Sequence, residues 1–156
     1  MRAVYVAAAL GAFALAGAVQ AADVQVVLGA DLAEKAEELG QGELDRLTEE
    51  LRRDVERAVA SDDALRDADI RLTLVDARPN RPTFEQMAAT PGLSMASLSI
   101  GGAAIEGEII AADGSRRSVA YDWYSHNIRD AVGSSTWTDA HRTFDRFASR
   151  LADGRL

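Results

Sequence analysis

The sequence is organised around residues 69–124, where apolar and polar side chains alternate in three separate runs. Alternation with a period of two predicts β-strands that have one buried face and one solvent-facing side. The three strands are expected at Ile70–Val75, Ser97–Ile110 and Ser118–Tyr124. Gly101-Gly102 falls inside the second run and predicts a bulge or bend in that strand.

The turn between the last two strands contains Asp113-Gly114, which is a strong hairpin signal. A two-residue loop would place Ile105 opposite Asp122 and so mix apolar residues with a carboxylate. A three-residue loop over residues 112–114 places Ile105 opposite Tyr121 and matches the apolar faces. We therefore predict a type I turn with the glycine left-handed in a bulge.

Helical patterns flank these strands on both sides. A short first strand at residues 24–28 is followed by apolar residues at helical spacing, most regularly over Leu44–Ala60. Gly40-Gln41-Gly42 precedes that stretch and predicts a kink or break, because glycine is unfavourable inside a helix. A second apolar stripe over Trp137–Leu151 predicts a final helix.

Three capping patterns mark where helices should begin. Each places a cap residue three positions before a carboxylate or amide side chain. They are Asp31 with Glu34, Thr83 with Gln86, and Thr136 with Asp139.

The resulting order, β-α-β-β-β-α, predicts an α+β two-layer sandwich. The sheet is expected to be mainly antiparallel and four-stranded, with the two helices on one face.

The N-terminal segment has the features of a secretory signal peptide. Arg2 is followed by an apolar run over residues 4–16 and by Val19-Gln20-Ala21, with small residues at the expected cleavage positions. Cleavage after Ala21 would leave residues 22–156 as a single α+β domain in the periplasm or outside the cell. An uncleaved membrane anchor is the alternative, but the apolar run is shorter than the roughly 20 residues that span a bilayer.

Composition excludes several function classes. The chain has no cysteine, so it has neither disulfides nor thiol chemistry nor a cysteine-based metal site. Its net charge is −8, and residues 22–69 carry 15 acidic against 6 basic side chains. This balance argues against binding of nucleic acid or an anionic membrane surface through that segment. No cofactor or metal is expected.

The connection over residues 77–96 is the best candidate for a recognition surface. Two of the three prolines lie in its first seven residues, 77–83, and the connection is long for a compact domain. Such loops are usually functional or ordered in their own right. The alternative is a packed lid in which Phe84, Met87 and Leu93 cover the edge of the sheet. The candidate ligand- or partner-binding residues, from this loop and from the segment after the last strand, are Arg78, Asn80, Arg81, His126 and Arg129.

No residue pattern identifies a catalytic site. His126 and His141 are the only histidines, and the spacing of His126 from Asp122 means little because Asp122 belongs to a predicted strand. Glu106 and Glu108 share one strand face and could act as an acid/base pair, but the solvent-facing side of a sheet carries the same pattern. No catalytic residue is assigned.

Four segments of this chain resemble small secreted proteobacterial domains of unknown function. They are Ala-Asp-Val-Gln-Val-Val at 22–27, Leu-Thr-Leu-Val-Asp at 72–76, Tyr-Asp-Trp-Tyr-Ser at 121–125 and Phe-Asp-Arg-Phe at 144–147. The resemblance implies a cell-envelope location and no assigned activity, so it transfers no site residue.

The sequence thus favours a binding module of the cell envelope over an enzyme. We expect an envelope protein as its partner, and a monomer or weak dimer without a stable membrane anchor. Two alternatives stay open at this point. One is a small-molecule or anion binder that uses Arg78, Arg81 and Arg129, and the other is a hydrolase with an unrecognised site.

Overall fold

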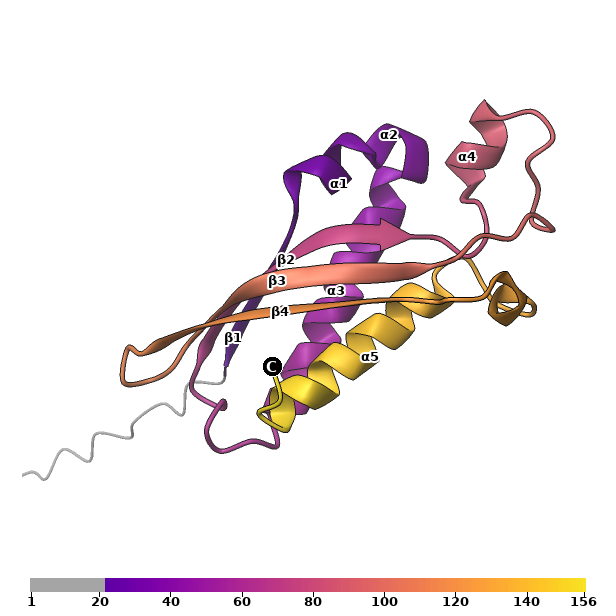
Figure 1. Ribbon diagram of the computed structural model, residues 1–156. Helices are drawn as coiled ribbons and strands as arrows, with labels where there is room; N and C mark the ends of the chain where they lie inside the picture. Colours follow the sequence, from indigo (N-terminus) through magenta and orange to yellow (C-terminus); the bar gives the residue numbers. More distant parts are fainter. Residues whose placement is uncertain (1–21) are drawn as a thin grey trace, which may run out of the picture.

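The computed structural model describes residues 22–156, so the predicted signal peptide lies outside the described part. Within that part, four strands form a sheet in chain order, with β1 and β4 at its edges (Figure 1). Strands β1 and β2 are parallel, whereas β2–β3 and β3–β4 are antiparallel. The strands are β1 (Asp23–Leu28), β2 (Asp69–Arg78), β3 (Gly102–Ile110) and β4 (Arg116–Tyr124).

The predicted break before the long helix is confirmed. Short helices α1 (Ala30–Glu34) and α2 (Ala36–Leu39) precede α3 (Gln41–Val59), and Gly40 between α2 and α3 has φ of 94°. A left-handed backbone here favours glycine and ends the helix. The predicted cap at Asp31 is wrong, because α1 begins at Ala30 with Gly29 at the cap position and has no side-chain cap.

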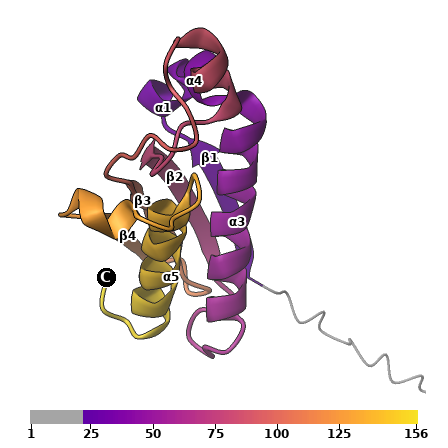
Figure 2. The same ribbon diagram turned by 90° about the vertical axis from the view of Figure 1, so that its right-hand side faces the viewer.

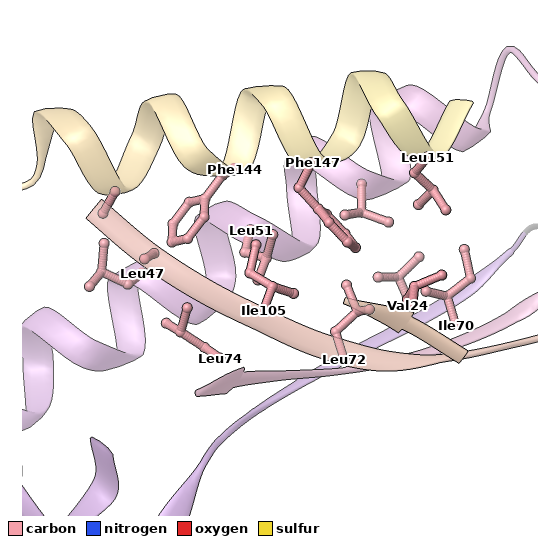
Figure 3. Packing of buried hydrophobic residues seen from close by; sticks show 14 of the residues in the cluster. Val24, Leu47, Leu51, Ile70, Leu72, Leu74, Ile105, Phe144, Phe147 and Leu151 are labelled. Atoms are coloured by element: carbon pink, nitrogen blue, oxygen red, sulfur yellow. The ribbon is translucent and has the colours of Figure 1, made fainter. Parts of the chain in front are cut away.

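Helices α3 and α5 (Thr138–Ala152) pack against each other and cover the same face of the sheet (Figures 1 and 2). Phe144, Phe147 and Leu151 of α5 point toward the strands, where they meet the inward side chains of the sheet (Figure 3). Complete burial of a side chain of this size stabilises the fold by about 1.5–3 kcal/mol. This arrangement confirms the predicted two-layer α+β sandwich. None of the helices in residues 22–156 combines the length and apolarity needed to cross a bilayer.

The predicted hairpin register is also confirmed. Ile105 lies opposite Tyr121, and the loop consists of residues 112–114. The Ala111 N–H donates to the Ser115 carbonyl at 2.9 Å, and Gly114 has φ of 82°. Matching of apolar faces therefore sets the register, because a shift of one residue would turn every inward side chain outward.

The start of β3 differs from the prediction. Residues 97–101 do not belong to the strand, because the Ser99 N–H donates to the carbonyl of Asn80 in the preceding loop. Gly102 is the first strand residue, with φ of 150°, so the predicted bulge inside β3 is wrong. The irregularity lies on β2 instead, between Leu74 and Asp76.

The face of the sheet away from the helices is polar, as the alternation predicts. Arg71, Thr73 and Glu106 lie on this open face, and Val27 of β1 is its exposed apolar exception. Glu108 on the same face pairs with Arg116 at 3.2 Å.

Candidate functional site

The loop after β2 and the segment after β4 meet at one end of the molecule (Figure 1). The loop, residues 79–101, contains α4 (Phe84–Ala89), and the segment, residues 125–137, contains the short 3-10 helix η1 (Ile128–Ala131). Backbone hydrogen bonds join the two, from Asn80 N–H to Thr136 O at 2.7 Å and from Ser125 N–H to Gly101 O at 3.0 Å. We call these two segments together the loop end.

Asn80, one of the predicted binding residues, is fully buried at the base of the loop end. Its Oδ1 accepts from the Asp139 N–H at 2.9 Å, and its Nδ2 donates to Asp139 Oδ2 at 2.6 Å. Asn80 therefore caps the first turn of α5 from a distant part of the chain. The predicted cap at Thr136 is wrong, because α5 begins at Thr138 and has no local side-chain cap.

Arg81 ties the two segments of the loop end together. Its Nε donates to the Ser134 carbonyl at 2.6 Å, and its Nη1 donates to the Met95 carbonyl. The guanidinium therefore donates to a backbone oxygen in each of the two segments. Arg81 thus orders the loop end by holding its parts together.

Arg78, at the end of β2, belongs to a charged cluster on the open face. Its Nε donates to Asp76 Oδ2 at 2.9 Å, and its guanidinium lies 4.5 Å from the ring centroid of Tyr124. The Tyr124 hydroxyl donates to the same carboxylate oxygen at 2.9 Å, and Lys35 lies 3.4 Å from the other oxygen.

The cluster shifts the pKa values of Asp76 and Tyr124 in opposite directions. Burial raises the pKa of Asp76, but the hydrogen bonds from Tyr124 and Arg78 outweigh it and hold that pKa below its ordinary value. Burial and the hydrogen bond to Asp76 together raise the pKa of the Tyr124 hydroxyl.

His126 and Arg129 lie on the exposed surface of the segment after β4. The Arg129 N–H donates to Asn127 Oδ1 at 3.0 Å, which begins η1. The five candidate residues are therefore divided among three places. Asn80 and Arg81 join the loop end, Arg78 lies on the open face, and the other two face solvent.

Helix α4 does not cover the sheet, so the expectation of a packed lid is wrong for Phe84, whose surface is 75% exposed. The helix packs against α2 instead, and Gln86 Nε2 donates to Glu38 at 2.9 Å. The predicted capping box at Thr83 and Gln86 is confirmed, with both reciprocal hydrogen bonds formed. Helix α4 therefore lies against the region where α2 ends and α3 begins, and not against the sheet.

The loop end carries most of the exposed large apolar side chains of the described residues. Among residues 22–156, six large apolar side chains are exposed, and five of them lie on these two segments. They are Phe84, Met95, Ile100, Ile128 and Val132. Exposed apolar side chains gathered on loops are typical of binding surfaces. Sequence reasoning missed four of the five, because they lie singly among polar residues and follow no period.

A pocket of about 320 Å³ opens between α4 and the chain that leads into β3. Its apolar walls include Pro79, Pro82 and Leu93, and its polar lining includes Ser97 and the side chain of Arg78. Mostly apolar walls with a few polar groups are typical of small-ligand or side-chain pockets.

In the part of the chain that the structure describes, no three His, Asp or Glu side chains are grouped closely enough to hold a metal ion. Glu106 is exposed on the open face and Glu108 is paired with Arg116, so the two glutamates lie on the solvent-facing side of the sheet, as the sequence pattern favours over an acid/base pair.

Comparisons with known proteins give no family for this chain. No family model matches it, and no curated protein matches it. Among solved structures, a crystal structure of a presumed lipoprotein from Caulobacter crescentus is 12% identical and aligns over 85% of this chain and 82% of its own. The TM-score of 0.32 is too low for this likeness to support an argument about fold or function.

Proposed function

We propose that this protein is an exported binding module of the cell envelope that contacts a protein partner through its loop end. The observation that carries the proposal is the placement of five of the six exposed large apolar side chains of residues 22–156 on the two segments of that end. A partner that covered them would remove apolar surface from water, which is the main driving force of protein association.

The loop end is also preorganised for binding. Asn80 and Asp139 are buried beneath it, and Arg81 bridges its two segments through backbone carbonyls. A surface that is ordered before binding loses less conformational entropy on association. The exposed side chains therefore stand on a fixed base, which favours recognition of one partner geometry.

The test is site-specific photo-crosslinking in the native envelope. A photoreactive residue at Phe84 or Val132 is expected to give the same discrete adduct from both positions. Val27 is the matched control, because it is a similarly exposed apolar residue on the open face. The adduct from Phe84 should weaken when Ile128 is replaced by Ser. Identical patterns from all three positions, or none from the loop end, would contradict the proposal.

The exported location has a separate test. Mass spectrometry of the protein recovered from the periplasm should give a chain that begins at Ala22. A cytoplasmic protein that still began at Met1 would contradict the proposal about location without bearing on the loop end.

A small-molecule binder is the second candidate, and the pocket beneath α4 favours it. The pocket fits a small, mostly apolar ligand better than a free anion, because Arg78 is already engaged by Asp76 and Tyr124. Leu93→Trp should fill the pocket and remove binding of such a ligand. Retained crosslinking at Phe84 in that variant would separate the two functions.

A further inference from the structure

Strand β4 forms an edge of the sheet that is open to pairing. Within residues 22–156, β4 pairs only with β3, and its nine residues run without a register shift. Long, regular edge strands readily accept a further strand, and proteins usually protect them with bulges, prolines or short length. Strand β4 has none of these three protections, and its charged side chains are Arg116 and Arg117 at its start and Asp122 near its end.

The hydrogen-bond pattern identifies the backbone groups that are free at this edge. The Ser125 N–H donates to the Gly101 carbonyl, and the Ala111 N–H donates to the Ser115 carbonyl. Every second residue of the chain from Ser115 to Ser125 therefore forms its backbone hydrogen bonds with β3. The intervening residues of β4, including Ser118 and Ala120, therefore direct their N–H and C=O groups away from β3. An incoming strand would bond to these groups.

Two arginines of α5 stand beside this edge, on the helix-covered side of the sheet. The Arg146 guanidinium lies 4.0 Å from the ring centroid of Trp123, and the Arg150 guanidinium lies 5.1 Å from that of Tyr121. Both arginines are exposed, and neither forms an ion pair with a carboxylate of the described residues. A guanidinium stacked on a ring keeps its N–H groups available for a carboxylate.

The spacing of these arginines matches an extended strand. Residues four apart on a helix are separated by about 6 Å along its axis, and alternate residues of a strand by roughly 6.5 Å. In an added strand, the side chains opposite Tyr121 and Trp123 would point to the same face as those rings. Acidic residues at alternate positions of that strand would therefore meet Arg146 and Arg150 in turn.

We infer that the β4 edge binds an extended acidic segment of a partner protein, which adds a fifth strand with alternate carboxylates on the two α5 arginines. This interface is separate from the loop end and does not depend on it. A second copy of the chain does not fit this description, because the inward faces of β1, β2 and β3 carry no acidic residue and that of β4 carries Arg117. Two β4 edges would bring like charges together.

The probe is the labelled peptide Thr-Glu-Thr-Glu-Thr-Glu-Thr. Its control is Thr-Glu-Glu-Thr-Thr-Glu-Thr, which has the same composition and charge but no two carboxylates at alternate positions. Fluorescence anisotropy at about 0.15 M salt limits non-specific attraction. The alternating peptide should bind, and the control should bind about tenfold more weakly. Absence of binding by the alternating peptide, or equal binding of both, would overturn the inference.

Three variants locate the interaction. Replacing both α5 arginines (Arg146→Gln with Arg150→Gln) should weaken binding by about tenfold or more, whereas Arg116→Gln, on the open face of β4, should change it by about twofold at most. Ala120→Pro removes an outward N–H and should abolish binding, while circular dichroism checks that the edge strand tolerates it. Unchanged binding in the double variant or in folded Ala120→Pro protein would overturn the inference.

Hydrogen exchange on the unmodified protein gives an independent readout. The amides of Ser118 and Ala120 should be protected when the alternating peptide binds, because they would donate to the new strand. Protection confined to the loop end, with no change along β4, would overturn strand addition even if the peptide binds.

Discussion

Asn80 and Asp139 lie 59 residues apart in sequence and form two hydrogen bonds inside the protein, where neither side chain is exposed. One bond caps α5, and the other satisfies a buried carboxylate that Arg142 also contacts at 2.8 Å. The pair fixes the loop after β2 onto the start of the last helix. Its loss should therefore affect the loop end and the fold together.

We expect Asn80→Ala to lower the free energy of unfolding by roughly 2–4 kcal/mol, because it removes a cap and leaves part of a buried carboxylate unsatisfied. Urea unfolding followed by circular dichroism measures the change. Asn127→Ala is the control, since Asn127 is exposed and caps only the short η1. A loss below about 1 kcal/mol would show that the buried pair is dispensable.

Replacing the two glycines at the helix break by alanine should change the free energy of unfolding in opposite directions. Gly42 lies in the first turn of α3 with open space around it, so Gly42→Ala should raise the free energy of unfolding by about 0.5 kcal/mol. Gly40 has φ of 94°, and a Cβ there would lie 2.6 Å from Glu85 Cδ. Gly40→Ala should therefore lower stability by about 1–3 kcal/mol, and thermal melts of both variants check the signs.

Tyr124→Phe tests the cluster around Asp76 through pH. The folded-state pKa of Asp76 lies below its ordinary value of 3.8, so this group stabilises the fold above that value and the contribution is lost as pH falls through the folded-state pKa. Without the hydroxyl, stability near pH 7 should fall by about 1 kcal/mol. The difference from the unmodified protein should shrink in acid; a constant difference at all pH values would argue against this linkage.

Asp54 on α3 should show the opposite dependence. Burial raises its pKa, with a further contribution from the nearby carboxylate of Asp145, although Arg57 at 2.7 Å opposes the shift. Because the folded-state pKa is raised, the ionised group costs stability near neutral pH, and the cost disappears as pH falls through that pKa. Asp54→Asn should therefore raise the unfolding midpoint at pH 7 and have less effect near pH 3. A lower midpoint at pH 7 would mean that the ion pair with Arg57 dominates.

The sequence predicted the parts of the fold that depend on local periodicity. The pairing of Ile105 with Tyr121 follows from the alternation of apolar and polar residues and from the three-residue turn, and both features can be recognised in the sequence. The break at Gly40 and the capping box at Thr83 are likewise decided within a few residues. These features need no information from distant parts of the chain.

The candidate site was less predictable. Asn80 and Arg81 were identified as binding residues from a polar, proline-containing loop, but their partners come from residues 134–139. The exposed apolar side chains of the loop end have no pattern in sequence, because their exposure depends on α4 packing against α2 instead of the sheet. Arg146 and Trp123 meet only because α5 crosses beneath β4.

The sequence alone determined which side chains face the core, since periods of two and of 3.6 residues are properties of the local backbone. Tertiary structure alone decided which polar groups are buried and hydrogen-bonded in the interior and which remain exposed at the surface. Hydrogen bonds such as those of Asn80 form between segments that only folding brings together, and the same packing that buries them leaves the loop end and the β4 edge open.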